Sequence, residues 1–113
     1  MNRQSEKMTG AQLDRLFAVI ESRRGGDPHA SYTAQLLSAG TAKMARKLGE
    51  ETTETVIAAL DGTPEQVISE SADLLYHLLV LWAGLEIKPE LVWEELAGRE
   101  SQSGLEEKQS RRD

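Results

Sequence analysis

A short break, Asp61-Gly62-Thr63, joins the two longest helical patterns of this chain and constrains its fold more than any other feature. Before the break, apolar residues recur at helical spacing from Thr41 onward. After it, Thr63-Pro64-Glu65-Gln66 places a capping residue before a first-turn proline, and the pattern continues to about Gly84. Because the connection is so short, we expect the two helices to form an antiparallel hairpin.

Three shorter helices complete the predicted architecture. The first covers residues 12–22 and ends in a stretch rich in helix breakers, Arg23-Arg24-Gly25-Gly26-Asp27-Pro28. The second opens at Ser31-Tyr32-Thr33 and ends at Gly40, and the last opens at Lys88-Pro89-Glu90. Since no segment alternates between apolar and polar residues as a strand does, the predicted fold class is all-α, a bundle of about five helices around the two long antiparallel ones.

The folded domain is expected to span residues 11–99. Residues 1–10 are polar and predicted to fray, and the charged residues 100–113 are predicted to form a disordered tail. The run from Leu74 to Leu81 is apolar on most sides, which predicts a central, buried element. The last helix is expected to pack through three apolar residues, Leu91, Val92 and Leu96.

Composition narrows the class of protein. A chain of 113 residues suffices for one small core. The absence of cysteine excludes disulfides, thiolate zinc sites and cysteine nucleophiles. A net charge of −6 argues against a nucleic-acid-binding surface, since phosphate backbones attract a basic stripe. No apolar run has transmembrane length and no secretion signal opens the chain, so we expect a cytoplasmic protein without membrane contact.

Four carboxylates form two pairs on the long helices, Glu51-x-x-Glu54 and Glu70-x-x-Asp73. A three-residue step places the two members of a pair on one helix face. The pairs can meet across the hairpin, and carboxylates that close repel each other unless a cation lies between them. Ligand sets made only of oxygen favour Mg²⁺, with Mn²⁺ as a possible substitute, and a polyphosphate is the expected substrate. The alternative is that both pairs are solvated surface charges.

Three further features have more than one interpretation. A di-iron site would need E-x-x-H on two helices, and the histidine near the carboxylates, His77, does not supply that pattern, so iron is disfavoured. His77 is expected to be a hydrogen-bonded core histidine or a partner of the ligands rather than a ligand. Glu50 either points into solvent or reaches the rim of the site and orients water. The turn Ser31-Tyr32-Thr33 is either a helix cap or a ligand contact.

Basic residues near the first acidic pair are candidates for binding substrate phosphates. Lys43 and Lys47 lie four residues apart on one helix, and we expect Lys47 to serve the site rather than only to pair with Glu51. Arg23 and Arg24 stand beside two glycines in a loop, and guanidinium groups hold phosphates by two parallel hydrogen bonds. For these two arginines, ordinary surface charge is an equal alternative.

Three segments carry a family pattern. They are Gly25-Gly26-Asp27-Pro28 with Ser31-Tyr32-Thr33, then Lys47-Leu48-Gly49-Glu50-Glu51-x-x-Glu54, then Ser69-Glu70-Ser71-Ala72-Asp73-Leu74-Leu75-Tyr76-His77-Leu78. Together, over residues 13–99, they resemble the phosphoribosyl-ATP pyrophosphatase family of histidine biosynthesis. The acidic motifs alone are shared with the wider MazG-like all-α nucleotide pyrophosphatases. Thr52 and Thr53 depart from the pattern, which has small apolar residues there.

The resemblance implies hydrolysis of phosphoribosyl-ATP to phosphoribosyl-AMP and pyrophosphate by a Mg²⁺-dependent helical dimer. It makes the four paired carboxylates the metal ligands, with Lys47 and Glu50 at the same site. We expect water as the nucleophile, since no serine, cysteine or histidine is arranged for covalent catalysis, and Glu50 or Glu54 as the group that activates it.

Two other functions are weighed against this one. The nearer alternative is a housekeeping (d)NTP pyrophosphatase that uses the same metal chemistry, and the more distant one is a non-catalytic helical interaction module. A homodimer is also suggested by an excess of apolar surface on the fourth helix, with Trp82 and Trp93 as candidate interface residues.

Overall fold

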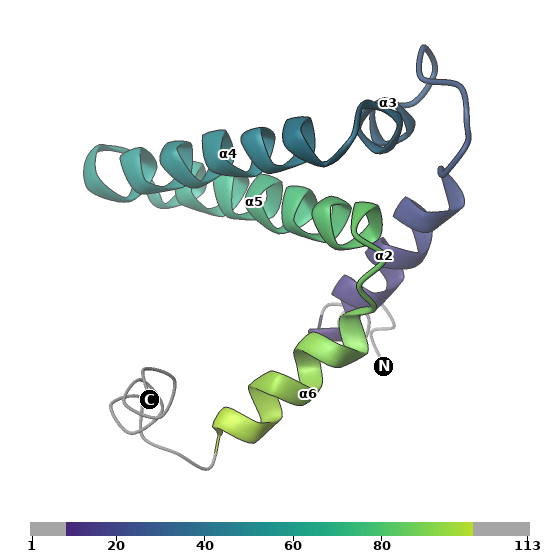
Figure 1. Ribbon diagram of the computed structural model, residues 1–113. Coiled ribbons are helices and arrows are strands. Elements are labelled where there is room, and N and C mark those ends of the chain that lie inside the picture. The colour runs from purple at the N-terminus through teal and green to yellow at the C-terminus, as the bar shows by residue number, and fades with distance from the viewer. Residues whose placement is uncertain (1–8, 101–113) are drawn as a thin grey trace, which may run out of the picture.

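The computed structural model describes residues 9–100, which fold into five helices (Figure 1). In chain order they are α2 (Ala11–Ser22), α3 (Tyr32–Ala39), α4 (Thr41–Asp61), α5 (Pro64–Gly84) and α6 (Pro89–Arg99). No strand occurs in this described range, so the all-α prediction is confirmed. The fraying expected for residues 1–10 and the tail expected at 100–113 fall almost entirely outside it. Within it, no helix combines the length and apolarity that a bilayer crossing requires.

The α4–α5 hairpin is the central element, and its turn is defined by local chemistry. The Thr63 hydroxyl accepts a hydrogen bond from the backbone N–H of Gln66 at 3.2 Å, and the Gln66 side chain accepts one from the N–H of Thr63 at 2.8 Å. A Cβ atom at Gly62 would lie 2.9 Å from the carbonyl oxygen of Ala58 and closer still to the Gln66 side chain. The predicted antiparallel hairpin is therefore confirmed, and its turn requires glycine.

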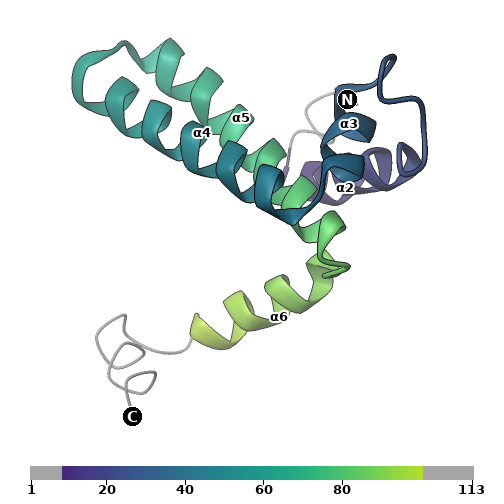
Figure 2. The same ribbon diagram turned by 45° about the horizontal axis from the view of Figure 1, so that its top comes forward.

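The hydrophobic core lies at the opposite end of the hairpin from this turn, where α5 meets α2 and α3 (Figure 2). It is built from six buried residues contributed by four helices: Ile20, Leu36, Met44, Leu79, Val80 and Ala83. The buried element predicted between Leu74 and Leu81 is thus confirmed for its second half, whereas Leu75 in the first half is exposed. One end of the hairpin is packed and the other is open.

The connections at the packed end use two residues with special roles. Ser31 caps α3, because its hydroxyl accepts a hydrogen bond from the N–H of Ala34 at 3.1 Å. Gly40 has φ +100°, a left-handed conformation that lets the chain pass directly from α3 into α4. The question whether this turn caps a helix is answered by Ser31, and its neighbour Tyr32 remains available for another role.

Helix α6 extends away from the hairpin (Figures 1 and 2). The prediction that Leu91 and Leu96 of α6 are packed is wrong. Both side chains are exposed in this single chain, because α6 makes few contacts with the other described helices. Among the contacts that hold α6 are those of its tryptophan. The ring of Trp93 meets Trp82 edge-on at a centroid distance of 5.7 Å, and its Nε1–H donates to the Asp14 carboxylate at 2.8 Å.

Candidate active site

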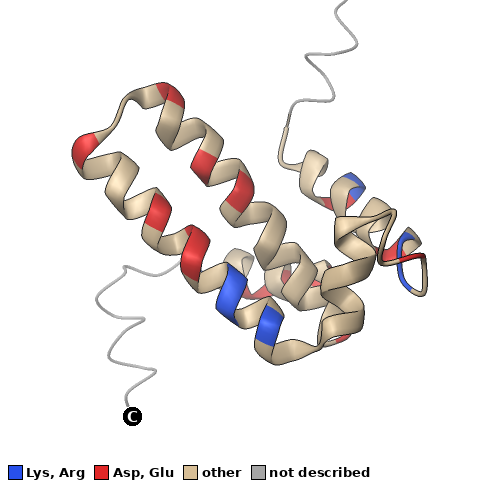
Figure 3. Ribbon diagram, turned by 90° about the horizontal axis from the view of Figure 1, so that it is seen from above, with Lys and Arg blue, Asp and Glu red and all other residues tan. Residues whose placement is uncertain are grey.

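Three of the four predicted metal ligands converge where α4 and α5 face each other. One carboxylate oxygen from each of Glu51, Glu70 and Asp73 lies within 4.8 Å of the others. Acidic bands of α4 and α5 lie opposite each other along the hairpin, and basic bands of α4 follow toward the packed end (Figure 3). The i,i+3 spacing on each helix and the antiparallel turn together produce this cluster.

The cluster contains oxygens that nothing in the described protein satisfies. Glu51 is only 9% exposed, and its Oε2 atom is buried without a hydrogen-bond partner among the described residues; the same holds for Oε2 of Glu70. Buried carboxylate oxygens without partners are costly. A hard cation with oxygen ligands, such as Mg²⁺ or Mn²⁺, would satisfy them, so the donor set fits the metal that the sequence predicts.

Electrostatics at the cluster favour the same cation. Burial raises the pKa of the Glu51 carboxyl, and the neighbouring carboxylate of Glu54 raises it further, because it accepts a hydrogen bond from protonated Glu51 and repels its ionised form. The pKa of Glu70 is also raised, first through its hydrogen bond with Glu54 and then by burial. Glu54 itself is exposed and lies outside the tight group of three, yet it acts on the pKa values of both Glu51 and Glu70. Such mutual repulsion is relieved when a cation binds.

Thr55 is a residue that the sequence analysis does not predict at the site, although it contacts the backbone of two of the clustered carboxylates. Its hydroxyl donates to the carbonyl of Glu51 at 2.8 Å and lies 3.3 Å from the carbonyl of Glu70 on the opposite helix. The sequence signal for Thr55 is its position four residues after Glu51, which places both residues on the same face of the helix. Thr52 and Thr53, where the family pattern has apolar residues, are exposed and bond back to carbonyls of their own helix.

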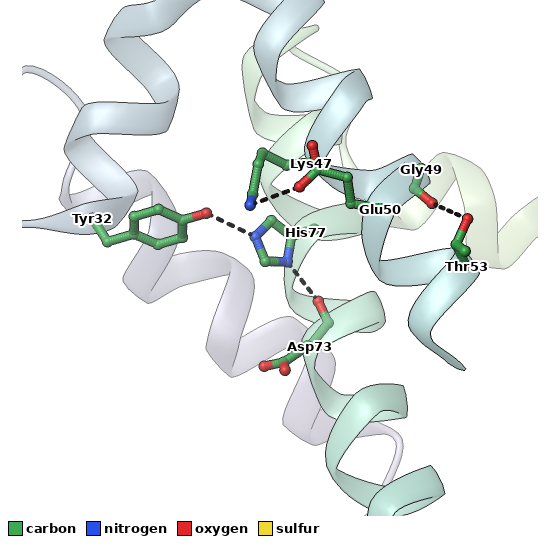
Figure 4. A network of polar contacts seen from close by, with 7 residues as sticks. All are labelled: Tyr32, Lys47, Gly49, Glu50, Thr53, Asp73 and His77. Atoms are coloured by element: carbon green, nitrogen blue, oxygen red, sulfur yellow. Dashed lines mark hydrogen bonds and ion pairs between the residues drawn. The ribbon is translucent and has the colours of Figure 1, made fainter. Parts of the chain in front are cut away.

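Lys47 and Glu50 form an ion pair beside the acidic cluster. The ammonium of Lys47 lies 3.0 Å from the Glu50 carboxylate, so its partner is Glu50 rather than Glu51 (Figure 4). This hydrogen bond raises the pKa of Lys47 and lowers that of Glu50. Lys43, one turn earlier on α4, is half-buried. The structure therefore brings both lysines to the same helix surface as the acidic pair.

His77 is buried next to the cluster and uses both ring nitrogens in hydrogen bonds (Figure 4). Its Nδ1 lies 2.8 Å from the backbone carbonyl of Asp73, and its Nε2 lies 3.1 Å from the hydroxyl of Tyr32. It is not part of the group of carboxylates that could hold an ion. His77 is thus a buried, hydrogen-bonded histidine, and its role beside the predicted ligands stays a prediction.

The structure does not bring Arg23 and Arg24 to the carboxylates. A side-chain N–H of Arg24 donates to the carbonyl of Ala83 at 2.6 Å, and the guanidinium also pairs with Glu21. Because Ala83 follows Asp73 by ten residues of α5, this contact lies about 15 Å from the cluster along the helix axis. Arg24 thus ties α2 to the end of α5, and Arg23 stands at the C-terminal cap of α2.

An open pocket of about 300 Å³ extends from the carboxylates toward the hairpin turn. Both helices line it, with Glu54 and Glu70 nearest the cluster, Asp61 nearest the turn and the apolar side chain of Ile57 between them. The pocket thus has carboxylates at both ends, and its volume is that of a small ligand site. The acidic cluster and this pocket therefore adjoin at the surface of the two-helix layer.

Comparison with known sequences decides the family. The sequence profile of a family described as phosphoribosyl-ATP pyrophosphohydrolase matches residues 13–100. The chain belongs to that family. A phosphoribosyl-ATP pyrophosphatase from Azospirillum brasilense is 54% identical over 107 residues, which cover 95% of this chain and 96% of the relative. One from Parvibaculum lavamentivorans is 56% identical over 101 residues, covering 89% and 93%.

Membership in the phosphoribosyl-ATP pyrophosphohydrolase family confirms the resemblance drawn from the three motifs. It makes the chain a member of a hydrolase family that acts on a pyrophosphate bond. The same comparison disfavours the housekeeping (d)NTP pyrophosphatase as its function. The role of each individual side chain stays a prediction.

Proposed function

We propose that this chain hydrolyses phosphoribosyl-ATP to phosphoribosyl-AMP and pyrophosphate with Mg²⁺ as cofactor, Mn²⁺ being able to replace it. The observation that carries the proposal is the group of three converging carboxylates with two buried, unpartnered oxygens. Family membership supplies the substrate, since relatives that match most of the chain carry the name of this activity.

The residues that would hold the cation are Glu51, Glu70 and Asp73, with Glu54 completing the set from the solvent side. When bound there, Mg²⁺ would polarise the bond between the α- and β-phosphates and neutralise charge on the departing pyrophosphate. Lys43 and Lys47 would balance the remaining phosphate charge from the adjacent turns of α4. Their closeness to the carboxylates supports this division of charge.

Glu54 is the better of the two candidate bases. The carboxylate of Glu50 is held by Lys47, and the lowered pKa of Glu50 makes it a weak proton acceptor. Glu54 is exposed and lines the pocket. A water molecule there would give its proton to Glu54 while its oxygen attacks the α-phosphorus; the bond to the bridging oxygen breaks, and pyrophosphate leaves with that electron pair. Glu50 would orient Lys47.

Arg23 and Arg24 are proposed to act at the other end of the substrate. Phosphoribosyl-ATP carries phosphate both on its adenosine and on its phosphoribosyl group, so its two anionic ends are well separated. The placement of Arg24 about 15 Å along α5 from Asp73 suits the end without the scissile bond.

A homodimer is proposed as the functional form. Apolar side chains stand exposed on the open half of the hairpin, namely Val56, Ile57, Leu60, Ile68 and Leu75. Leu60 is 83% and Ile68 is 70% exposed, which is unusual for a monomer and typical of a surface that a partner covers. A second copy of the hairpin would bury this surface. Trp82 and Trp93, by contrast, already contact each other within the chain.

The test compares substrates and cations. Purified protein with Mg²⁺ should turn over phosphoribosyl-ATP with a kcat/KM at least about 100-fold above that for any member of a dNTP panel. A chelator should abolish turnover, and Mg²⁺ should raise the Tm because it binds the folded state. Equal turnover of dNTPs would show a general nucleotide pyrophosphatase. No turnover and no Mg²⁺-dependent Tm shift would show a non-catalytic module.

A further inference from the structure

The hydrogen bonds of His77 determine which group the hydroxyl of Tyr32 donates to. The carbonyl oxygen of Asp73 can only accept, so Nδ1 of His77 must donate to it. In the neutral imidazole, Nε2 is then the bare nitrogen and accepts. The hydroxyl of Tyr32, 3.1 Å from Nε2, therefore donates its single proton to His77. The phenol oxygen keeps its lone pairs for a different group.

Other contacts hold the ring of Tyr32 in place while leaving its edge accessible. The ring stacks on Tyr76 at a centroid distance of 6.3 Å and an interplanar angle of 23°. Tyr76 is hydrogen-bonded in turn to the hydroxyl of Thr33. His77 is 5% exposed, whereas Tyr32 is 46% exposed. A buried anchor thus orients a side chain that solvent can reach.

Tyr32 also lies on the substrate side of the molecule. Lys47, which is proposed to balance substrate phosphate charge, extends from α4 toward the same imidazole that the Tyr32 hydroxyl contacts (Figure 4). The phenol, the ammonium and the imidazole point toward one another from three helices (Figure 4). Because both the phenol oxygen and a phosphate oxygen would be acceptors, Tyr32 in this arrangement suits a ligand hydroxyl and not a phosphate.

We propose that Tyr32 binds the substrate by accepting a hydrogen bond from a ribose hydroxyl, and that His77 is the positioning residue that fixes the Tyr32 proton. The inference rests on the proposed function, since it assigns a further contact at that site. It gives the turn before α3 a role in ligand binding beyond its helix cap. It also explains why a buried histidine links the start of α3 to the backbone of a metal-binding residue on α5.

The experiment uses Tyr32→Phe, which keeps the ring and its stacking but removes the hydroxyl. With phosphoribosyl-ATP and Mg²⁺, KM should rise about 3- to 10-fold, the size of one lost neutral hydrogen bond, while kcat changes less than about 2-fold. The matched control is Ser38→Ala, which removes an exposed hydroxyl from the same helix, bonded only to the carbonyl of Gln35; it should leave KM unchanged. An unaltered KM in Tyr32→Phe would overturn the proposal.

His77 is tested through its dependence on Tyr32. His77→Asn should raise KM in the wild-type background and add almost nothing in the Tyr32→Phe background, because both changes remove one contact. His77→Gln, which can offer an amide oxygen near the place of Nε2, should recover part of the loss. Additive KM effects would assign His77 a merely structural role and overturn its part of the inference.

The donor on the ligand is found with nucleotide inhibitors. ATP should inhibit wild-type protein more strongly than 2′-deoxy-ATP or 3′-deoxy-ATP, and Tyr32→Phe should remove that difference if the adenosine ribose is the donor. A KM effect without this loss of discrimination would place the donor on the phosphoribosyl group. Wild-type protein that lacks activity on phosphoribosyl-ATP would refute the proposed function itself, which the Tyr32 variant cannot do.

Discussion

The two ends of the α4–α5 hairpin share one secondary structure and have opposite surroundings. At the packed end, Met44, Leu79 and Val80 are buried against α2 and α3. At the turn end, Leu60 and Ile68 extend into solvent. The turn end is built by local capping alone, while the packed end holds the core. The same hairpin therefore separates what stabilises the single chain from the surface left for other molecules.

The carboxylates lie at the border between these ends. Glu51 is buried like a core residue, yet Glu54, one turn later on α4, is exposed like its apolar neighbours toward the turn. A site at such a border can hold charges in a partly dry environment and still admit a ligand. Substitutions made separately at each end, and at the border between them, measure what each region contributes to activity and to stability.

The largest effect is expected at the border, on activity. Glu51→Gln should lower kcat/KM for phosphoribosyl-ATP by more than about 100-fold, since even residues that only support metal ligands cost about 10- to 100-fold when changed. Steady-state kinetics at saturating Mg²⁺ measures it. Glu65→Gln, an exposed carboxylate in the first turn of α5, is the control and should keep full activity. Full turnover in Glu51→Gln would show that Glu51 is not a ligand.

The next effect separates the two ends by stability. Leu36→Ala, at a fully buried position, should lower the free energy of unfolding by about 2–5 kcal/mol. Leu60→Ala at the turn end should cost less than about 0.5 kcal/mol in dilute protein. Chemical denaturation measures both. If the chain dimerises through the open surface, the cost of Leu60→Ala grows with protein concentration. A large cost that is independent of concentration would mean that the turn end is packed within one chain.

A smaller effect is expected from the turn itself. Gly62→Ala should destabilise the fold by about 1–2 kcal/mol, because the added Cβ meets the carbonyl of Ala58 and the capping side chain of Gln66. The comparison is Gly49→Ala in the middle of α4, where a Cβ meets no neighbouring atom; it should stabilise by about 0.5–1 kcal/mol. Thermal unfolding of both variants is the measurement, and equal signs would contradict the role of the turn.

The smallest effect is a dependence of stability on pH. The pKa values of Glu51 and Glu70 are raised in the folded state, so their contribution is fully present below the unfolded pKa of about 4.3 and is lost as pH rises through the folded values. Without divalent cations, Glu51→Gln with Glu70→Gln should therefore have a Tm a few degrees above wild type at pH 7 and no advantage at pH 4.

Scanning calorimetry over this pH range tests the sign. Adding Mg²⁺ at pH 7 should raise the Tm of wild type and leave the double variant unchanged, because only the wild-type cluster gains from the cation. A double variant that is less stable than wild type at pH 7 without cations would show that the carboxylates are satisfied by the protein.

Local signals in the sequence predicted most of the fold. Caps and breakers such as Thr63, Pro64 and Gly40 act on their own neighbours, so the helix ends fall within about two residues of expectation. The packing of α6 was not predictable in this way. Leu91 and Leu96 follow helical spacing, but burial depends on whether another element lies against them, and no local pattern states that.

In the candidate site, too, features set by local spacing were predictable from the sequence, and features set by distant contacts were not. The meeting of Glu51 with Glu70 and Asp73 follows from spacing plus one turn, so the sequence was sufficient to predict it. The role of Arg24 was not predictable, because its partner is a backbone carbonyl 59 positions away and a carbonyl leaves no trace in the side-chain pattern. The Tyr32–His77 bond joins two side chains, but they lie 45 positions apart, and local spacing does not predict which distant residues meet.

The hydrogen bond from Arg24 to the carbonyl of Ala83 has a consequence for the order of folding. Contacts within the α4–α5 hairpin join segments on either side of a short turn, whereas the Arg24–Ala83 hydrogen bond closes a loop of 59 positions. Since loop closure costs more entropy as the loop lengthens, the hairpin is expected to form first and α2 to dock late. The carboxylates of α4 and α5 are therefore expected to meet before α2 completes the core.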